Sequence, residues 1–211
     1  MAALPLNQPN RYLWGRPPVA ALLIAPHEVS SPMRYDPDTR HRRSIRLKGY
    51  DYTQPAPYFV TVCVQGREAI FGKIVGEEMQ ANDAGRMVGA AWDDLPRHYP
   101  GVQIDAFVVM PNHIHGIIVL TNPTDPARLS LPDVVHRFKS FTTAQYRRGV
   151  ENNGWPPFAG RLWQRNYYEH VIRDEDEWNR IRDYIRTNPQ GWALDSENPG
   201  VTRPGKPEAP W

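Results

Sequence analysis

The stretch VVMPNHIHGIIVL, residues 108–120, places two histidines one residue apart at the start of an apolar run. Proline favours an extended residue before it and Pro-Asn is typical of a turn, so one strand ends near Met110 and a new strand begins at His113. Successive side chains of a strand point to opposite faces, about 7 Å separating every second residue. His113 and His115 therefore share one face, while Ile114 points into the core.

Two imidazoles on one face of a strand can converge on one metal ion. Alternatively, the two histidines are polar residues at the end of a strand and have no metal-binding role. A metal site would need a third ligand from elsewhere in the chain.

The remaining elements predict an α+β fold with a mostly antiparallel sheet. The dense β-branched and aromatic run YFVTVCV, residues 58–64, predicts a central strand that is buried on both faces. Three helices are predicted because each has a capping residue at its start, apolar residues at helical spacing and a Gly or Pro at its end. They span residues 82–95, 130–148 and 174–188, and end at Pro96, Gly149 and Pro189.

The chain of 211 residues is long enough for one well-packed domain. Its 22 prolines and a mean hydropathy of −0.61 indicate much chain outside a core. The prolines gather at both ends, so we predict an irregular extension over residues 1–40, a folded domain over residues 41–195 and an irregular tail over residues 196–211.

Cysteine content and hydropathy restrict the classes of protein that are consistent with the sequence. Cys63 is the single cysteine, which excludes an internal disulfide and a Cys-based zinc site and is typical of a reducing compartment. No apolar run is long enough to span a bilayer. We therefore expect a cytoplasmic protein without a membrane partner.

The helix predicted over residues 174–188 contains a second pair of polar side chains. Tyr184 and Asn188 are four residues apart and lie on the same face of the helix. Tyr184 sits at the edge of the apolar stripe, where a hydroxyl can face outward. In the alternative interpretation, Tyr184 is a half-buried aromatic residue and Asn188 only ends the helix.

Basic residues cluster, although the net charge is only +2. Arg42, Arg43, Arg46 and Lys48 form a strip without acidic residues, which can bind phosphates or can be a solvated arm before the domain. The polar side of the helix over residues 130–148 is also basic and includes Lys139.

The segments MPNHIHG (110–116) and YIRTNP (184–189) together resemble the HUH single-tyrosine transposases. The wider stretches 43–52, 58–64 and 163–173 look like the branch called REP-associated tyrosine transposases, which are IS200-like. The resemblance covers nearly the whole predicted domain.

The resemblance implies a ferredoxin-like antiparallel sheet that carries the histidine pair, with helices packed on it and a C-terminal helix that carries the nucleophile. By position, Tyr184 would be the nucleophile that forms a 5′-phosphotyrosine. His113, His115 and Asn188 would hold Mg²⁺ or Mn²⁺, although many relatives have glutamine at the third position. Tyr167 and Tyr168 are rival nucleophiles by residue type, but they precede the helix and have no amide four residues later.

The family acts on single-stranded DNA that is folded into hairpins, in particular REP repeats. Backbone contacts are expected from the basic strip and from two further residues, Lys139 and Arg165. Exposed aromatic residues near Trp155 and Tyr167 would stack on unpaired bases. A monomer is the expected state and a homodimer the alternative.

Two other functions are consistent with the same residues. A non-catalytic hairpin-binding protein would use only the basic surfaces of the fold. A metal-dependent hydrolase would use the histidine pair to activate water and would leave no protein bound to the DNA.

Overall fold

The computed structural model describes residues 49–121 and 129–201. The strands are β1 (Ala56–Cys63), β2 (Gly72–Val75), β3 (Glu78–Ala81), β4 (Val102–Val109), β5 (His113–Leu120) and β6 (Tyr168–Val171). The α-helices are α1 (Asp83–Asp93), α2 (Leu95–His98), α3 (Leu131–Asn153) and α4 (Glu175–Thr187). Two 3-10 helices complete the list, η1 (Gln65–Arg67) and η2 (Asn188–Leu194). No helix within these ranges combines the length and the apolar character that a membrane span requires.

Four strands form the main sheet in the order β4-β5-β1-β6, and every neighbouring pair is antiparallel. Strands β2 and β3 form a separate hairpin. This order, with α1 between β1 and β4 and α3 between β5 and β6, is that of a ferredoxin-like fold. The predicted α+β, ferredoxin-like class is confirmed.

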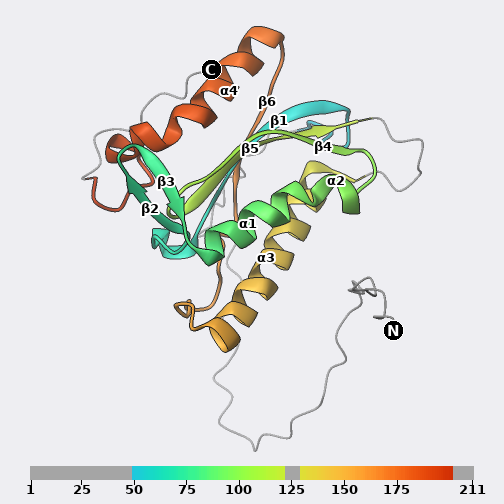
Figure 1. Ribbon diagram of the computed structural model, residues 1–211. Helices are drawn as coiled ribbons and strands as arrows, with labels where there is room; N and C mark the ends of the chain where they lie inside the picture. Colours follow the sequence, from blue (N-terminus) through green and yellow to red (C-terminus); the bar gives the residue numbers. More distant parts are fainter. Residues whose placement is uncertain (1–48, 122–128, 202–211) are drawn as a thin grey trace, which may run out of the picture. The chain divides into compact units, whose positions relative to one another are not determined.

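Helices cover the two faces of the sheet unequally (Figure 1). Helices α1 and α3 contribute to the larger core on one face, where Val60 and Ile114 are fully buried. Helix α4 packs on the other face, where Ile181 and Ile185 meet Phe59 and the smaller core. The prediction that β1 is buried on both faces is therefore confirmed.

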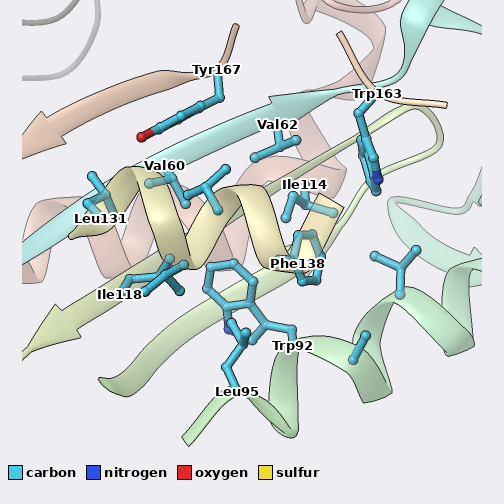
Figure 2. Close-up of a cluster of buried hydrophobic side chains, with 14 of the residues drawn as sticks. Val60, Val62, Trp92, Leu95, Ile114, Ile118, Leu131, Phe138, Trp163 and Tyr167 are labelled. Carbon is cyan, nitrogen blue, oxygen red and sulfur yellow. The ribbon is translucent and has the colours of Figure 1, made fainter. Parts of the chain in front are cut away.

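Trp92 lies at the centre of the larger core (Figure 2). Its indole stacks on Phe107 at 4.6 Å between ring centroids and meets the edge of Phe138 at 5.6 Å. Gly116, in the histidine-bearing strand β5, lies against this indole, and a Cβ at that position would collide with the ring. A glycine is needed here because backbone and indole pack directly together.

Gly116→Ala is expected to destabilise the protein by about 1–3 kcal/mol, because the extra methyl group forces Trp92 or β5 to move. Urea denaturation measures the effect. Gly89→Ala is the matched control, since a Cβ there meets no atom within 4 Å, and in a helix interior alanine is favoured over glycine by about 1 kcal/mol. Equal stabilities of the two variants would contradict this account of Gly116.

Two predicted helix ends differ from the structure. Helix α1 ends at Asp93, and Pro96 belongs to the first turn of α2 rather than stopping α1. Helix α3 continues beyond Gly149 to Asn153 and ends at Gly154, which has the left-handed φ of 66°. Gly149 is inside the helix because the ring of Trp155 packs against its backbone, where a Cβ has no room.

Residues beyond α4 fold back onto the domain. Pro189 lies in the first turn of η2, which ends at Leu194. The segment that follows, residues 195–198, is bound to the start of the domain, because Arg67 donates to the carbonyl oxygen of Ser196 and pairs with the carboxylate of Glu197. Residues 196–198, placed in the tail by sequence, thus contact the domain.

Candidate metal and tyrosine site

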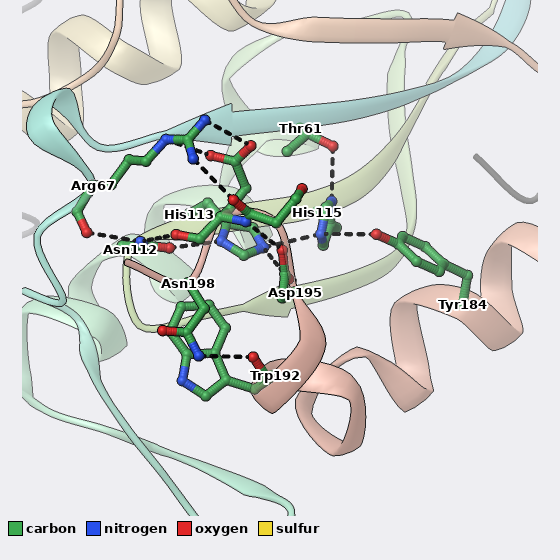
Figure 3. A network of polar contacts seen from close by, with 11 residues as sticks. Thr61, Arg67, Asn112, His113, His115, Tyr184, Trp192, Asp195 and Asn198 are labelled. Atoms are coloured by element: carbon green, nitrogen blue, oxygen red, sulfur yellow. Dashed lines mark hydrogen bonds and ion pairs between the residues drawn. The ribbon is translucent and has the colours of Figure 1, made fainter. Parts of the chain in front are cut away.

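The two histidines, a tyrosine and an aspartate meet at the start of β5 (Figure 3). His113 and His115 are the first and third residues of β5. Tyr184 reaches them from α4, and Asp195 reaches them from the segment after η2. Three parts of the chain, β5, α4 and the segment after η2, therefore supply one site.

The imidazoles of His113 and His115 converge as the spacing predicted. Both side chains are buried, and their Nε2 atoms are 3.0 Å apart. Two nitrogens that each lie about 2.1 Å from one ion, at the right angle of an octahedron, are about 3.0 Å apart. The separation matches the one that two ligands of a single ion require.

Asn112 fixes the proton of His113. Its Nδ2 donates to the carbonyl oxygens of Arg67 and Glu197, at 2.8 and 2.7 Å, so its Oδ1 is the atom that faces His113. Nδ1 of His113 lies 2.8 Å from that oxygen and must carry the hydrogen. Nε2 of His113 is thereby left with a free lone pair directed at the site, as metal binding requires.

His115 is held by two residues of β1. Its Nδ1 lies 2.8 Å from the hydroxyl of Thr61, which is its partner in the strand register. Phe59 stacks on the imidazole at 5.5 Å between centroids. Burial lowers the pKa of His115 to about 3, and burial together with the neighbouring His115 lowers the pKa of His113 well below its usual range. Both imidazoles are neutral at physiological pH and able to bind a metal.

Asp195 completes a cluster of three ligand atoms that lie within 4.8 Å of one another. Its Oδ2 is 3.7 Å from Nε2 of His113, but the contact is not an ion pair because His113 is neutral. Burial and the nearby Glu197 raise the pKa of the Asp195 carboxyl group. A cation would stabilise a carboxylate that is buried beside another negative charge, so the cluster could hold a metal ion.

Asn188, predicted as the third ligand, is buried at the end of α4. Its Oδ1 accepts no hydrogen bond from any group in the described ranges. A buried oxygen without a partner costs free energy, and coordination of an ion would satisfy it. The donor set of two imidazoles, a carboxylate and an amide oxygen fits a divalent cation.

Tyr184 faces the pair of histidines. Its hydroxyl oxygen is 3.5 Å from Nε2 of His115, and its ring meets the edges of His115 and Phe59 at 5.2 and 6.0 Å. Burial, with the Asp195 carboxylate second, raises the pKa of Tyr184 to about 12. The phenol is therefore protonated at neutral pH and must lose its proton during any attack.

The rival tyrosines occupy other positions. Tyr167 is buried in the larger core, and the ammonium group of Lys139 lies 5.1 Å from its ring centroid. The expectation that Tyr167 is exposed for stacking on bases is wrong, because its side chain packs in the larger core. Tyr168 lies on the α4 side of the sheet, beside Phe59, but α4 presents Tyr184 to the histidines instead.

The residues predicted to contact DNA are only partly described. Arg42, Arg43, Arg46 and Lys48 lie outside the described residues. Arg165 is exposed. The ammonium group of Lys139 donates to the carbonyl oxygens of residues 164–166, at 3.1–3.4 Å, so it holds the loop that carries Arg165.

Sequence reasoning missed Asp195, Thr61 and Asn112. Asp195 lies on an irregular segment with no periodic pattern, and η2 brings it back to β5. Thr61 could have been found from the antiparallel pairing of β1 with β5, which places it opposite His115. Asn112 was recognised as a turn residue, but its side-chain amide also orients a histidine.

The neutral histidines predict how the stability of the metal-free protein depends on pH. Below pH 6.5 the unfolded chain protonates His115, whereas the folded chain does so only near pH 3. The free energy of unfolding is therefore expected to fall by about 1 kcal/mol through His115 between pH 6.5 and 5.5, and the slope approaches about 1.4 kcal/mol per pH unit at lower pH. Urea denaturation in chelator at pH 6.5 and 5.5 measures this loss.

His115→Gln isolates the contribution of this histidine. Asp195, whose folded pKa is raised, changes stability in the opposite direction and remains in both proteins. The variant is expected to show a smaller loss of stability on acidification than the original chain. The same loss in both would mean that His115 accepts a proton in the folded state.

Comparison with known proteins finds one matching family and several relatives. The model of the family described as transposase IS200 like matches residues 89–188, a range that includes both histidines, Tyr184 and Asn188 and ends before Asp195. A Haemophilus influenzae protein described as uncharacterized is 38% identical over 179 residues, which cover 77% of this chain and 96% of that protein.

Two further relatives and one solved structure carry more specific descriptions. A putative REP-associated tyrosine transposase of Haemophilus influenzae is 26% identical over 139 residues, or 66% of this chain and 73% of that protein. A REP-associated tyrosine transposase of Escherichia coli K12 is 31% identical over 93 residues, or 43% of this chain and 47% of that protein. The structure of a REP-associated tyrosine transposase bound to a REP hairpin is similar with a TM-score of 0.48 and 22% identity, over 67% of this chain and 70% of that one.

Proposed function

The chain belongs to the family of IS200-like transposases, and on that basis we propose that it nicks and rejoins single-stranded DNA through a covalent bond to Tyr184. One observation carries the proposal: the hydroxyl of Tyr184 lies 3.5 Å from a buried imidazole that belongs to a cluster of metal-ligand atoms. A nucleophile beside a cation site is the arrangement that transfer of a phosphodiester needs.

In the first step the hydroxyl oxygen of Tyr184 attacks the phosphorus of a DNA phosphodiester. The new bond joins tyrosine to the 5′-phosphate, and the bond from phosphorus to the 3′-oxygen breaks. The proton lost by the phenol balances the proton gained by the departing 3′-oxygen, which leaves as a hydroxyl group. Because one phosphoester replaces another, a free 3′-hydroxyl can later reverse the reaction and rejoin a strand.

We propose that His113, His115 and Asp195 hold Mg²⁺ or Mn²⁺, with Asn188 as a further oxygen donor. When bound, the ion supplies positive charge against the non-bridging oxygens of the phosphate. Asn112 and Thr61 orient the imidazoles, and Phe59 shields His115 from water on one side.

The proposed substrate is DNA folded into a REP-type hairpin, which the names of two relatives support. The basic strip Arg42, Arg43, Arg46 and Lys48 would contact the phosphates together with Arg165, and Lys139 would support the loop before Arg165. We propose that one chain, acting as a monomer in the cytoplasm, is sufficient because Tyr184 meets the histidines of its own chain.

Labelled hairpin oligonucleotides test this function. A 3′-labelled strand incubated with the protein and Mn²⁺ or Mg²⁺ is expected to become attached to protein, whereas a 5′-labelled strand is released with a free 3′-hydroxyl. Chelator should prevent both results, and an oligonucleotide of equal composition without a hairpin should react poorly.

Two outcomes would contradict the proposal. Cutting that leaves a free 5′-phosphate and no adduct would indicate a hydrolase. Hairpin binding without cutting in either metal would indicate a non-catalytic DNA-binding protein.

A further inference from the structure

Strand β4 contains a bulge that changes the direction of one acidic side chain. Ile104 pairs with Ile118 and Phe107 pairs with Gly116, so three steps along β4 match two steps along β5. Ile104 and Phe107 pack on the core under α1 and α3. The extra residue lets Asp105 and Ala106 both point to the α4 side, which is a common role of bulges near active sites.

Asp105 binds two side chains of α4. Its carboxylate accepts from Nη2 of Arg182 at 2.6 Å, from Nε of Arg182 at 3.1 and 3.2 Å, and from the indole nitrogen of Trp178 at 2.8 Å. The guanidinium group also lies over the Trp178 ring, 4.9 Å from its centroid. Both side chains of the ion pair are shielded, with exposed fractions of 32% for Arg182 and 24% for Asp105.

A second polar contact holds the beginning of the same helix. His170 of β6 lies 2.8 Å from the carboxylate of Glu177, which also accepts from the backbone nitrogen of Arg173. Strands β4 and β6 are the two edges of the sheet. Helix α4 is thus fixed at both edges and crosses the central strands β5 and β1, which carry His115 and Phe59.

Polar contacts of this kind determine the position of a helix more strictly than apolar ones do. Ile181 and Ile185 attach α4 to the sheet, but apolar burial has no direction and permits small sliding or rotation. A bidentate carboxylate–guanidinium pair fixes both distance and angle. Arg182 precedes Tyr184 by two residues, so its attachment sets where the phenol oxygen lies.

We propose that Asp105 is a positioning residue, which acts through Arg182 and Trp178 to hold Tyr184 at the histidine pair. This inference rests on the proposed function of Tyr184 as the nucleophile. Displacement of a reacting atom by about 1 Å can slow a reaction about 100-fold. The bulge in β4 is therefore part of the apparatus that aligns the nucleophile.

Single-turnover formation of the adduct tests the proposal. Asp105→Ala is expected to lower the rate at saturating hairpin about 10- to 100-fold, while the hairpin concentration for half-maximal rate changes little. Arg182→Ala should give a similar loss, and the double variant should be little slower than either single variant. Asp105→Asn keeps an acceptor for Trp178 and is expected to recover part of the rate.

Asp183→Ala is the matched control, because Asp183 pairs with Arg186 and both side chains are exposed on the same helix. It should react at the original rate. An Asp105→Ala rate equal to that of Asp183→Ala would overturn the proposal, as would a loss confined to hairpin affinity.

A measurement without DNA separates this proposal from the proposed function. In protein labelled with 3-fluorotyrosine, the ¹⁹F resonance of Tyr184 is assigned by its absence from Tyr184→Phe. It should shift in Asp105→Ala and not in Asp183→Ala, because the ring lies against His115 and Phe59. An unchanged resonance in Asp105→Ala would refute the positioning role. If the resonance shifts but the original chain forms no adduct with DNA, only the proposed role of Tyr184 as the nucleophile is refuted.

Discussion

Tyr184→Phe is expected to eliminate the covalent protein–DNA adduct, a decrease of at least about a thousandfold in its rate of formation. The change removes one oxygen atom and leaves the ring that packs against His115 and Phe59, so the fold and the site should persist. Denaturing electrophoresis of a 3′-labelled hairpin measures the adduct. Hairpin binding by the variant should equal that of the original chain.

Tyr168→Phe is the control that the structure offers. Tyr168 lies on the same side of the sheet and also contacts Phe59, but it belongs to β6 rather than α4. Its loss should leave adduct formation nearly unchanged. An adduct that survives Tyr184→Phe and disappears with Tyr168→Phe would transfer the role of nucleophile to Tyr168.

His115→Ala is expected to abolish high-affinity binding of Mn²⁺, with a decrease of at least about 100-fold, because even residues that only support a ligand contribute 10- to 100-fold. Titration calorimetry in the absence of DNA measures the affinity directly. Adduct formation should decrease in parallel. His98→Ala, which removes an exposed imidazole of α2, should leave both properties unchanged.

The same titration distinguishes the two candidates for the third ligand. Asp195 lies within the cluster of ligand atoms, so Asp195→Ala is expected to weaken Mn²⁺ binding more than Asn188→Ala does. In addition, Asp195→Ala removes a negative charge from the site, whereas Asn188→Ala does not. The reverse order would mean that the amide oxygen of Asn188 is the stronger ligand.

The parts of the site that the sequence predicted are those with a local pattern. The alternation around His113 and His115 predicted a strand with both imidazoles on one face, and Asp174 and Pro189 bounded the helix that carries Tyr184. These features depend on neighbours within a few residues. The structure confirms each of these placements.

The features of the site that the sequence did not predict depend on contacts between distant segments. Asp195 reaches the histidines only because η2 turns the chain back and Arg67 binds Glu197. Asp105 faces α4 because β4 has one extra residue, a bulge, in its pairing with β5. The bulge depends on how the two strands pair, which the sequence of one strand does not show. Gly149 had the properties of a helix end, but tertiary packing of Trp155 explains it instead.

The late position of Tyr184 and Asp195 in the chain has a consequence for protein synthesis. A nascent chain that has reached α3 already holds β1 and β5 with both imidazoles, yet neither the phenol nor the carboxylate has been made. Cutting activity is thus expected to be confined to molecules translated beyond Asp195. A product that ends within α3 would lack both residues, so under the proposed function it is expected to form no adduct with DNA.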